Sequence, residues 1–206
     1  MNIVIVGAGN VGRALGSSWR KAGHKVTVAV RDPAAPKVAE LKQQGFGIAA
    51  MKDAAAAGEV IVLTVPWPAL TQAVQSLGPL SGKIIIDATN PLAPDMSLAI
   101  GHNDSAGETV ARLAPGGRVV KAFNTTGANN MADSSYAGGK VMMPVAGDDS
   151  DAKATVMALA RELGFEPIDT GPLAMSRHLE PMAMVWIKLA LVQKLGRNFG
   201  FALLRR

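Results

Sequence analysis

NIVIVGAGNVGRAL, residues 2–15, is the stretch that decides the fold, because a short apolar run leads directly into the glycine pattern G-x-G-x-x-G. The apolar run is typical of a strand buried on both faces of a sheet. The segment after it, residues 9–22, has the pattern of a helix that ends at Gly23. A glycine pattern that follows a strand and opens a helix predicts a dinucleotide-binding βαβ unit, whereas the same pattern elsewhere would indicate only a glycine turn.

The residues of this glycine loop have separate physical roles in the prediction. Gly7 permits the tight turn, with Ala8 after it, and Gly9 lets the backbone approach a pyrophosphate. Gly12 lets the helix pack closely on the sheet. The N-terminus of that helix presents free N–H groups and a partial positive charge to phosphates. We therefore expect a dinucleotide to bind here.

The end of the second predicted strand, VAVRDP at residues 28–33, bears on which nicotinamide cofactor binds. An acidic residue there would hydrogen-bond the ribose 2′-hydroxyl of NAD, whereas an arginine would accommodate the 2′-phosphate of NADP. Arg31 takes the first position after the strand, about 20 residues beyond the glycine loop. Asp32 keeps NAD as an alternative, unless it caps the next helix ahead of Pro33. The sequence favours NADP(H).

The rest of the chain alternates apolar runs with amphipathic stretches, which is the pattern of successive βαβ units. We predict an α/β fold: a Rossmann-type, doubly wound and mostly parallel sheet, with residues 1–206 as a single NADP-binding domain. Residues 172–206 are expected to form a helical segment that packs on this domain or on a partner subunit. The strands are expected at residues 2–7, 25–30, 46–49, 59–65, 83–87, 117–123, 140–146 and 165–169. The helices are expected at residues 9–22, 33–44, 66–77, 148–163 and, for most of its length, 173–204.

Four of the predicted strands are followed by loops rich in Thr, Asn and Pro. Ligands of open α/β sheets bind beyond the carboxyl ends of the strands. Such clusters also occur in ordinary turns, but their donors and acceptors suit the carboxamide of a nicotinamide. We expect the four loops to frame the nicotinamide together. They are Thr64–Pro68, Ala88–Leu92, Asn124–Gly127 and Thr170–Leu173.

The composition excludes several classes of function. The 206 residues contain no cysteine, which rules out disulfides, thiolate catalysis and cysteine-ligated metals. The three histidines have no spacing typical of a metal site or a triad, so no metal is expected, and only His178 is a candidate pocket residue. The net charge of +5 suits a polyanionic ligand, but the basic residues are too dispersed for a nucleic-acid module. We expect a cytoplasmic protein that binds neither nucleic acid nor membrane.

Six segments from the first predicted strand to the last helix carry a resemblance to known proteins: GAGNVGRAL (7–15), TVPW (64–67), IDATNPL (86–92), VVKAFNT (119–125), VAGDD (145–149) and DTGPLAMSRHLEP (169–181). Through them the chain resembles the family of NADPH-dependent deazaflavin oxidoreductases. It is also similar to the cytoplasmic domain of the six-transmembrane ferric reductases. The resemblance implies an NADP-dependent enzyme that moves a hydride between the nicotinamide and an 8-hydroxy-5-deazaflavin coenzyme.

The resemblance also implies roles for individual residues. Asn10 and Val11 would hold the pyrophosphate together with the three glycines of the loop, and Arg31 would bind the 2′-phosphate. The path from adenosine to pyrophosphate would be flanked by Thr64, Val65, Pro66 and Trp67. The nicotinamide would be surrounded by Thr89, Asn90, Pro91, Phe123, Asn124 and Thr125.

The sequence leaves the second substrate open. Hydride transfer between two bound rings needs no protein nucleophile or metal, and no catalytic acid or base is assigned. FMN, FAD, a quinone and a ferric chelate are alternatives to the deazaflavin, and a nonenzymatic NADP(H) sensor or binding module is a further alternative. About 35 residues follow Gly171, fewer than the helical domains that other reductases with this fingerprint append, so we expect a small planar acceptor in an open cleft.

The C-terminal stretch 179–204 is apolar around much of its circumference, which predicts a buried helix. Packing against the sheet accounts for one face of such a helix. A homodimer would account for the rest. The residues concerned are Trp186, Ile187, Leu189, Leu191, Val192, Leu195, Phe199 and Phe201.

Overall fold

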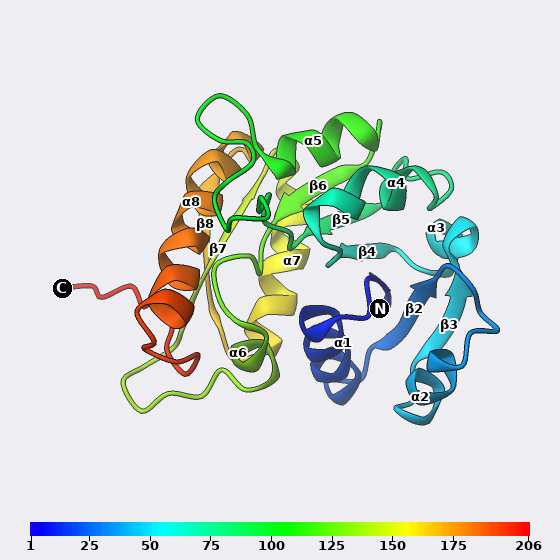
Figure 1. Ribbon diagram of the computed structural model, residues 1–206, viewed down its shortest axis with the longest axis horizontal. Coiled ribbons are helices and arrows are strands. Elements are labelled where there is room, and N and C mark those ends of the chain that lie inside the picture. Colours follow the sequence, from blue (N-terminus) through cyan, green and yellow to red (C-terminus); the bar gives the residue numbers. More distant parts are fainter.

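Eight strands form one sheet in the order β3-β2-β1-β4-β5-β6-β7-β8. The computed structural model describes residues 1–206, with every side chain except that of Lys37. Figure 1 shows the sheet crossing the molecule from β3 on the right to β8 on the left. The strands are Asn2–Val6 (β1), Lys25–Val30 (β2), Gly47–Ala50 (β3), Val60–Leu63 (β4), Ile84–Asp87 (β5), Arg118–Lys121 (β6), Met142–Gly147 (β7) and Glu166–Gly171 (β8).

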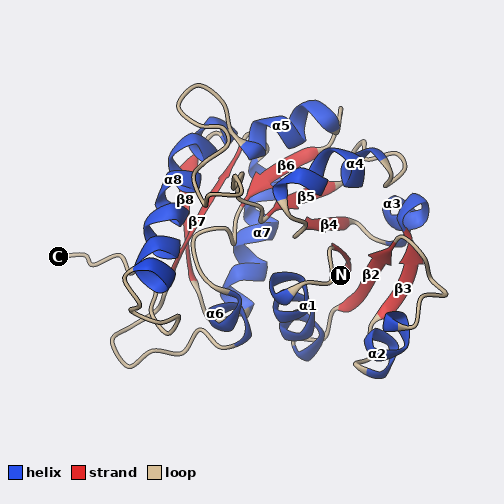
Figure 2. Ribbon diagram, in the orientation of Figure 1, coloured by secondary structure: helices blue, strands red, loops and turns tan.

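Helices cover both faces of the sheet (Figure 2). Successive residues of a strand point to opposite faces, so Ile3 and Ile5 join one hydrophobic cluster, beneath α1, α2, α6 and α7. Val4 and Val6 join a second cluster, beneath α3, α4 and α5. The helices are Asn10–Lys21 (α1), Lys37–Gln43 (α2), Ala54–Ala57 (α3), Leu70–Gln75 (α4), Ala106–Leu113 (α5), Ala128–Ala132 (α6), Ser150–Glu162 (α7) and Ser176–Ile187 (α8).

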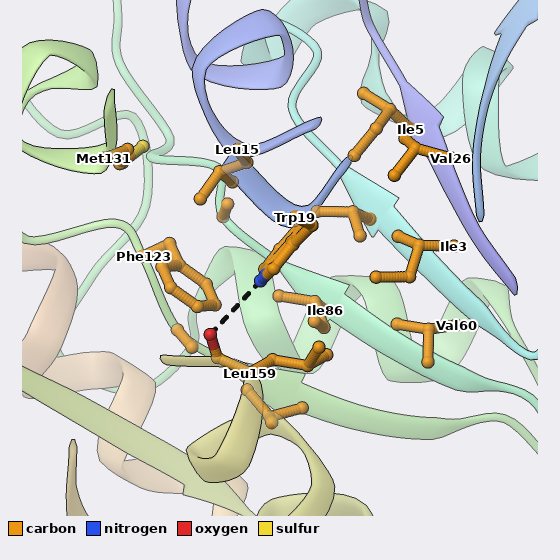
Figure 3. Close-up of a cluster of buried hydrophobic side chains, with 14 of the residues drawn as sticks. Ile3, Ile5, Leu15, Trp19, Val26, Val60, Ile86, Phe123, Met131 and Leu159 are labelled. Carbon is orange, nitrogen blue, oxygen red and sulfur yellow. Dashed lines mark hydrogen bonds between the residues drawn. The ribbon is translucent and has the colours of Figure 1, made fainter. Parts of the chain in front are cut away.

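Trp19 of α1 anchors the first cluster (Figure 3). Its side chain is fully buried, and its indole nitrogen donates a hydrogen bond of 3.2 Å to the carbonyl of Leu159 in α7. The Trp19 ring meets the edge of Phe123 with 5.5 Å between centroids, and Phe123 meets Phe165 in the same way at 6.3 Å. Because α1 begins at the glycine loop, these contacts fix that loop to both halves of the sheet.

The predicted fold class is confirmed, since all eight expected strands are present in a mostly parallel sheet. The sequence did not reveal the directions of the last two strands. β6 pairs with β7 in antiparallel register, with Val120 opposite Gly147, and β7 pairs with β8 in parallel register. The connection between β6 and β7, residues 122–141, contains only the short helix α6 instead of a full crossover helix, and parallel neighbours need such a crossover.

The prediction of a mostly helical segment through Leu204 is wrong. Helix α8 continues only as a short π-helix at Lys188–Val192 (η4), and the chain beyond it is irregular. Lys194 and Gly196 adopt left-handed backbone angles, with φ of +56° and +83°, which is how many helices end. The tail then folds back: Phe199 stacks on Trp186 at 5.2 Å, and the carbonyl of Phe201 accepts a bond from the backbone N–H of Met142.

One helix boundary and one additional helix also differ from the sequence prediction. Helix α2 begins at Lys37 instead of Pro33, because the Asp32 carboxylate accepts a bond from the Ala34 N–H and holds a turn there. Helix α5 was not predicted, although Ser105 caps its start: its hydroxyl oxygen accepts from the Glu108 N–H at 3.1 Å, and the hydroxyl donates to the Glu108 carboxylate at 2.7 Å. In the described part of the chain, no helix is long and apolar enough to cross a membrane.

Candidate dinucleotide and acceptor site

A cleft of about 740 Å³ opens where β1, β2 and β4 end. These strands are parallel neighbours, so the loops after them meet at one edge of the sheet. We call Gly7–Gly12, Arg31 and Thr64–Trp67 the glycine-loop half of the site. Its residues that line the cleft are Gly7, Ala8, Gly9, Arg31, Thr64, Val65 and Pro66.

The three loop glycines occupy different environments. Gly7 has φ +110°, and a Cβ there would lie 2.9 Å from the carbonyl carbon of Thr64. A Cβ on Gly12 would lie 2.0 Å from the carbonyl oxygen of Gly7, so the loop and α1 pack too closely for a side chain. A Cβ on Gly9 would meet no atom within 4 Å. The second glycine therefore borders open space, where a ligand can lie against the backbone.

The N-terminus of α1 faces this open space. Gly9 is its N-cap, and within the described residues no side chain caps the helix. Asn10 is exposed at the first helical position, and Val11 is partly buried against the first cluster. The first-turn N–H groups of an uncapped helix bind anions well, so the residues present fit a pyrophosphate.

Thr64 holds the glycine loop in place. Its hydroxyl lies 2.7 Å from the carbonyl oxygen of Gly7 and 3.1 Å from that of Val6, and it can donate to either. The next residues shape the wall of the cleft: Val65 and Trp67 are partly buried against the second cluster, and Pro66 is exposed. Thr64 thus borders the cleft and also holds the glycine loop in position through the carbonyl groups of Val6 and Gly7.

Arg31 and Asp32 both line the cleft at the end of β2. Asp32 Oδ1 accepts a hydrogen bond of 2.9 Å from the Ala34 N–H, so the carboxylate is engaged in a local turn. Arg31 is exposed, and none of the described carboxylates forms an ion pair with it. A free guanidinium beside an engaged carboxylate fits a 2′-phosphate better than a bare 2′-hydroxyl.

The loops after β5 and β6 form the second part of the site, which we call the amide half (Thr89–Pro91 and Phe123–Thr125). Asn90 Nδ2 donates to the Asn124 backbone carbonyl at 2.9 Å. Asn124 Nδ2 lies 3.2 Å from Asn90 Oδ1 and 3.1 Å from the carbonyl of Leu179 in α8, as donor to both. Thr89, Pro91, Asn124 and Thr125 are all buried. The two predicted loops are therefore brought together.

Asn124 Oδ1 is a buried acceptor that receives no hydrogen bond from the described residues. Buried polar atoms are nearly always paired. The amide N–H₂ of a nicotinamide carboxamide is a donor of the kind this oxygen can accept.

Phe123 contributes to the amide half mainly through its backbone. Its side chain is buried in the core between Trp19 and Phe165. Its φ of +62° is left-handed, which costs a non-glycine residue on the order of 1–3 kcal/mol. The turn redirects the chain at the end of β6, so that Asn124 meets Asn90.

A buried ionic network behind the amide half was missed by the sequence analysis. Lys121, at the end of β6, is fully buried, and its Nζ lies 2.9 Å from Asp87 Oδ2 and 2.7 Å from Glu180 Oε1. The same Nζ donates to the Thr89 carbonyl at 2.7 Å. Asp87 Oδ1 also accepts from the Thr89 hydroxyl at 2.7 Å, so the network fixes the loop after β5.

Glu180 links this network to α5. Its carboxylate accepts from the backbone N–H groups of Ala106 and Gly107, at 3.1 and 3.2 Å. Burial raises the pKa of Glu180, and the nearby Lys121 ammonium opposes that rise. Burial by itself would lower the pKa of Lys121, but the carboxylates of Asp87 and Glu180 outweigh it and the pKa is raised. Charged residues in otherwise apolar strands, Asp87 in KIIID and Lys121 in VVKAF, were the signal that could have revealed this network.

Two further sequence predictions differ from the structure. Thr170–Leu173 does not join the other three loops, because β8 runs opposite to β1–β6 and ends in the other direction. Leu173 instead packs into the second hydrophobic cluster, and the Thr170 hydroxyl donates to the Val145 carbonyl. His178, the candidate pocket histidine, is exposed on α8.

The open glycine-loop half, beside a closed amide half at the same sheet edge, is the arrangement of a dinucleotide-dependent oxidoreductase. Residues 2–91 match the family described as "NADP oxidoreductase coenzyme F420-dependent". The chain is 32% identical to the F420-dependent NADP reductase of Methanothermobacter thermautotrophicus, with 96% of this chain and 91% of that protein covered. A crystal structure from Arthrobacter sp. FB24, provisionally named an F420-dependent NADP-reductase, has a TM-score of 0.91 and 34% identity, with both chains fully covered.

A second group of relatives is longer than this chain. The chain is 31% identical to the metalloreductase STEAP3 of Rattus norvegicus over 87% of its own length, but spans only 36% of that protein. The near full-length match to the archaeal reductase decides the family. The chain belongs to the coenzyme F420-dependent NADP oxidoreductases. It is an NADP-dependent oxidoreductase, as the sequence predicted.

Proposed function

We propose that the protein transfers a hydride between NADP(H) and the deazaflavin coenzyme F420, bound beside the amide half. The observation that carries the proposal is the open space at Gly9, which lies at the uncapped end of α1 and in the same cleft as Arg31. The near full-length similarity to the archaeal F420-dependent NADP reductase supports the choice of acceptor.

The residues of the glycine-loop half bind and orient the nucleotide in this proposal. Gly7, Ala8, Gly9, Asn10, Val11 and Gly12 receive the pyrophosphate at the end of α1, and Arg31 pairs with the 2′-phosphate. Thr64 holds the loop, and Val65, Pro66 and Trp67 border the path from adenosine to pyrophosphate. When bound, NADP(H) supplies or accepts the hydride at its nicotinamide ring.

The amide half positions the nicotinamide and keeps water away from it. Asn124 Oδ1 accepts the carboxamide donor, and Asn90 and Leu179 hold Asn124 in place through its Nδ2. Thr89, Pro91 and Thr125 surround the ring with buried surface, and Phe123 sets the turn that presents Asn124. A fixed, dry site of this kind brings two rings together without a protein nucleophile.

A single-turnover experiment tests the proposal. The protein is mixed with NADPH, and nicotinamide oxidation is followed at 340 nm with F420, FMN, FAD or no acceptor. Oxidation with F420 at least about tenfold faster than with either flavin would support the proposal. Binding of NADPH with no oxidation by any acceptor would favour the nonenzymatic sensor instead.

A ferric chelate is a second candidate acceptor, because the chain is also similar to the STEAP3 metalloreductase. The same experiment with ferric citrate, alone and with added FAD, separates the two. Iron reduction that needs FAD would place a flavin beside the nicotinamide, and the deazaflavin proposal would then fail.

We also propose that the protein works as a cytoplasmic homodimer with residues 1–206 as one NADP-binding unit. Val185, Leu191, Val192 and Leu195 leave an apolar surface exposed at the end of α8 and just beyond it, with exposed fractions between 44% and 63%. A second copy of the chain would cover this surface. Sedimentation of the intact protein as a monomer at micromolar concentration would contradict the dimer.

A further inference from the structure

Arg13 is a second cation of the cleft, with a role that neither the sequence fingerprint nor the family similarity assigns. It follows the glycine loop directly and lines the same cleft as Arg31. Its Nε donates a hydrogen bond of 3.0 Å to the carbonyl of Ala8, which holds the guanidinium over the loop. Its terminal nitrogens pair with the Glu40 carboxylate of α2.

The Arg13–Glu40 ion pair is one that Arg13 can leave for another anion. The two side chains are 36% and 53% exposed, and ion pairs that face solvent contribute little to stability, so this pair can be replaced at little cost. The Arg13 guanidinium holds the pKa of Glu40 below its usual range, so Glu40 stays ionised near neutral pH. Gln44 also donates to Glu40, at 3.0 Å, which gives the carboxylate a partner when Arg13 leaves.

A phosphate dianion is a better partner for an arginine than a single exposed carboxylate, because it offers more charge and several acceptor oxygens. Arg13 is tethered at the loop and Arg31 stands at the end of β2, so the cleft has one cation on each element. Asp32, the carboxylate next to Arg31, is engaged by the Ala34 N–H.

We propose that Arg13 is a second residue that selects the 2′-phosphate of NADP(H), and that Glu40 holds its guanidinium beside the cleft until the nucleotide binds. This inference rests on the proposed role of Arg31 and adds a second cation to the same phosphate site. Arg13 then changes partners from Glu40 to the phosphate, while its bond to Ala8 is retained.

Calorimetric titration with NADPH and with NADH, at one ionic strength, tests the inference in four proteins: wild type, Arg13→Gln, Glu40→Gln and Arg112→Gln. Arg112 of α5 is the control, because it also forms a solvent-facing ion pair, with Asp104 just before the helix, and does not line the cleft. We expect Arg13→Gln to weaken NADPH about tenfold and NADH less than about twofold. Glu40→Gln should tighten NADPH about threefold, because the competing carboxylate is lost. Arg112→Gln should change neither.

The outcomes separate this inference from the proposed function. Equal weakening of NADPH and NADH by Arg13→Gln would mean that Arg13 only supports the glycine loop, and no change would mean that it plays no part. Either result overturns the inference and leaves the role of Arg31 intact if Arg31→Gln, measured in the same way, still weakens NADPH about tenfold and NADH little. A wild-type protein without any preference for NADPH would instead overturn the 2′-phosphate site as a whole.

Discussion

The two halves of the site differ in how much of their hydrogen bonding is complete before any ligand arrives. In the glycine-loop half, the end of α1 is uncapped, Gly9 borders open space, and Arg31 has no ionic partner among the described residues. In the amide half, Asn90 and Asn124 already bond to each other.

This difference separates the groups that should determine ligand affinity from the groups that should determine folding stability. Groups that lack partners in the free protein gain them from the ligand, so substitutions there should change affinity and leave folding intact. Groups that are buried and paired contribute to folding stability, because removing one partner leaves the other buried without a hydrogen bond. Apart from the unpaired Asn124 Oδ1, the same sheet edge therefore holds a half whose substitutions should change ligand affinity and a half whose substitutions should change stability.

Lys121→Met, which removes a buried and fully paired group, should give the largest effect on the free energy of unfolding. It would leave the Asp87 and Glu180 carboxylates without their ammonium, and breaking a buried pair costs about 3–5 kcal/mol. Denaturant unfolding measures the loss. Lys153→Met is the control, because the Asp169 carboxylate that it leaves is 48% exposed and can be hydrated, so the loss should be smaller. Equal losses in the two variants would show that the buried network adds no more to stability than the Lys153–Asp169 pair.

Gly9→Val tests the open side. Its side chain would enter the space where the pyrophosphate is proposed to lie, and Gly9 has an ordinary φ of −77°, so folding should not suffer. We expect NADPH affinity to fall about 100-fold, or about 2.7 kcal/mol, with an unchanged melting temperature. Gly138→Val is the control, since a Cβ there also meets nothing within 4 Å. Unchanged NADPH affinity in Gly9→Val would place the phosphates elsewhere.

Arg31→Gln tests which part of the nucleotide the open half recognises, through the affinities for NADPH and NADH. Loss of the guanidinium should weaken NADPH about tenfold, or about 1.4 kcal/mol, and leave NADH binding nearly the same. Arg161→Gln on the exposed surface of α7 serves as the control for the change in net charge. If NADH weakened as much as NADPH, Arg31 would act on the adenine or ribose and the 2′-phosphate would have another partner.

Glu108 should give the smallest effect, at the rim of the buried half. Arg177, and then Ser105, hold the pKa of Glu108 below its usual range against the opposing effect of burial. A lowered pKa adds stability above the ordinary glutamate value of about 4.3, and this stability is lost as pH falls through the folded-state pKa. Glu108→Gln should therefore cost at most about 1 kcal/mol at pH 7 and nothing at the acid end. Unfolding curves at several pH values check this, and a pH-independent difference would contradict it.

Local sequence patterns predicted those parts of the fold and site that depend on neighbours in the chain. The glycine loop, Arg31 and the strands were recognisable because turn, helix start and strand each have their own signature. The direction of β7, the fold of the C-terminal tail and the Lys121 network depend on which segments meet in space. The glycines and Asn198 in the stretch KLGRNFGF were a local warning that a helix could not continue through Leu204.

Glu180 has one more consequence, which concerns the polarity of the bound dinucleotide. Helices α1 and α5 both begin at the edge of the sheet where the parallel strands end, and the N-terminus of each is an anion site in principle. In α5 that place is already taken by the protein's own carboxylate, which accepts from Ala106 and Gly107. A pyrophosphate finds only the α1 terminus free of these two. The internal anion thus distinguishes the two helix starts, and a nucleotide phosphate placed at α5 would meet repulsion where α1 offers attraction.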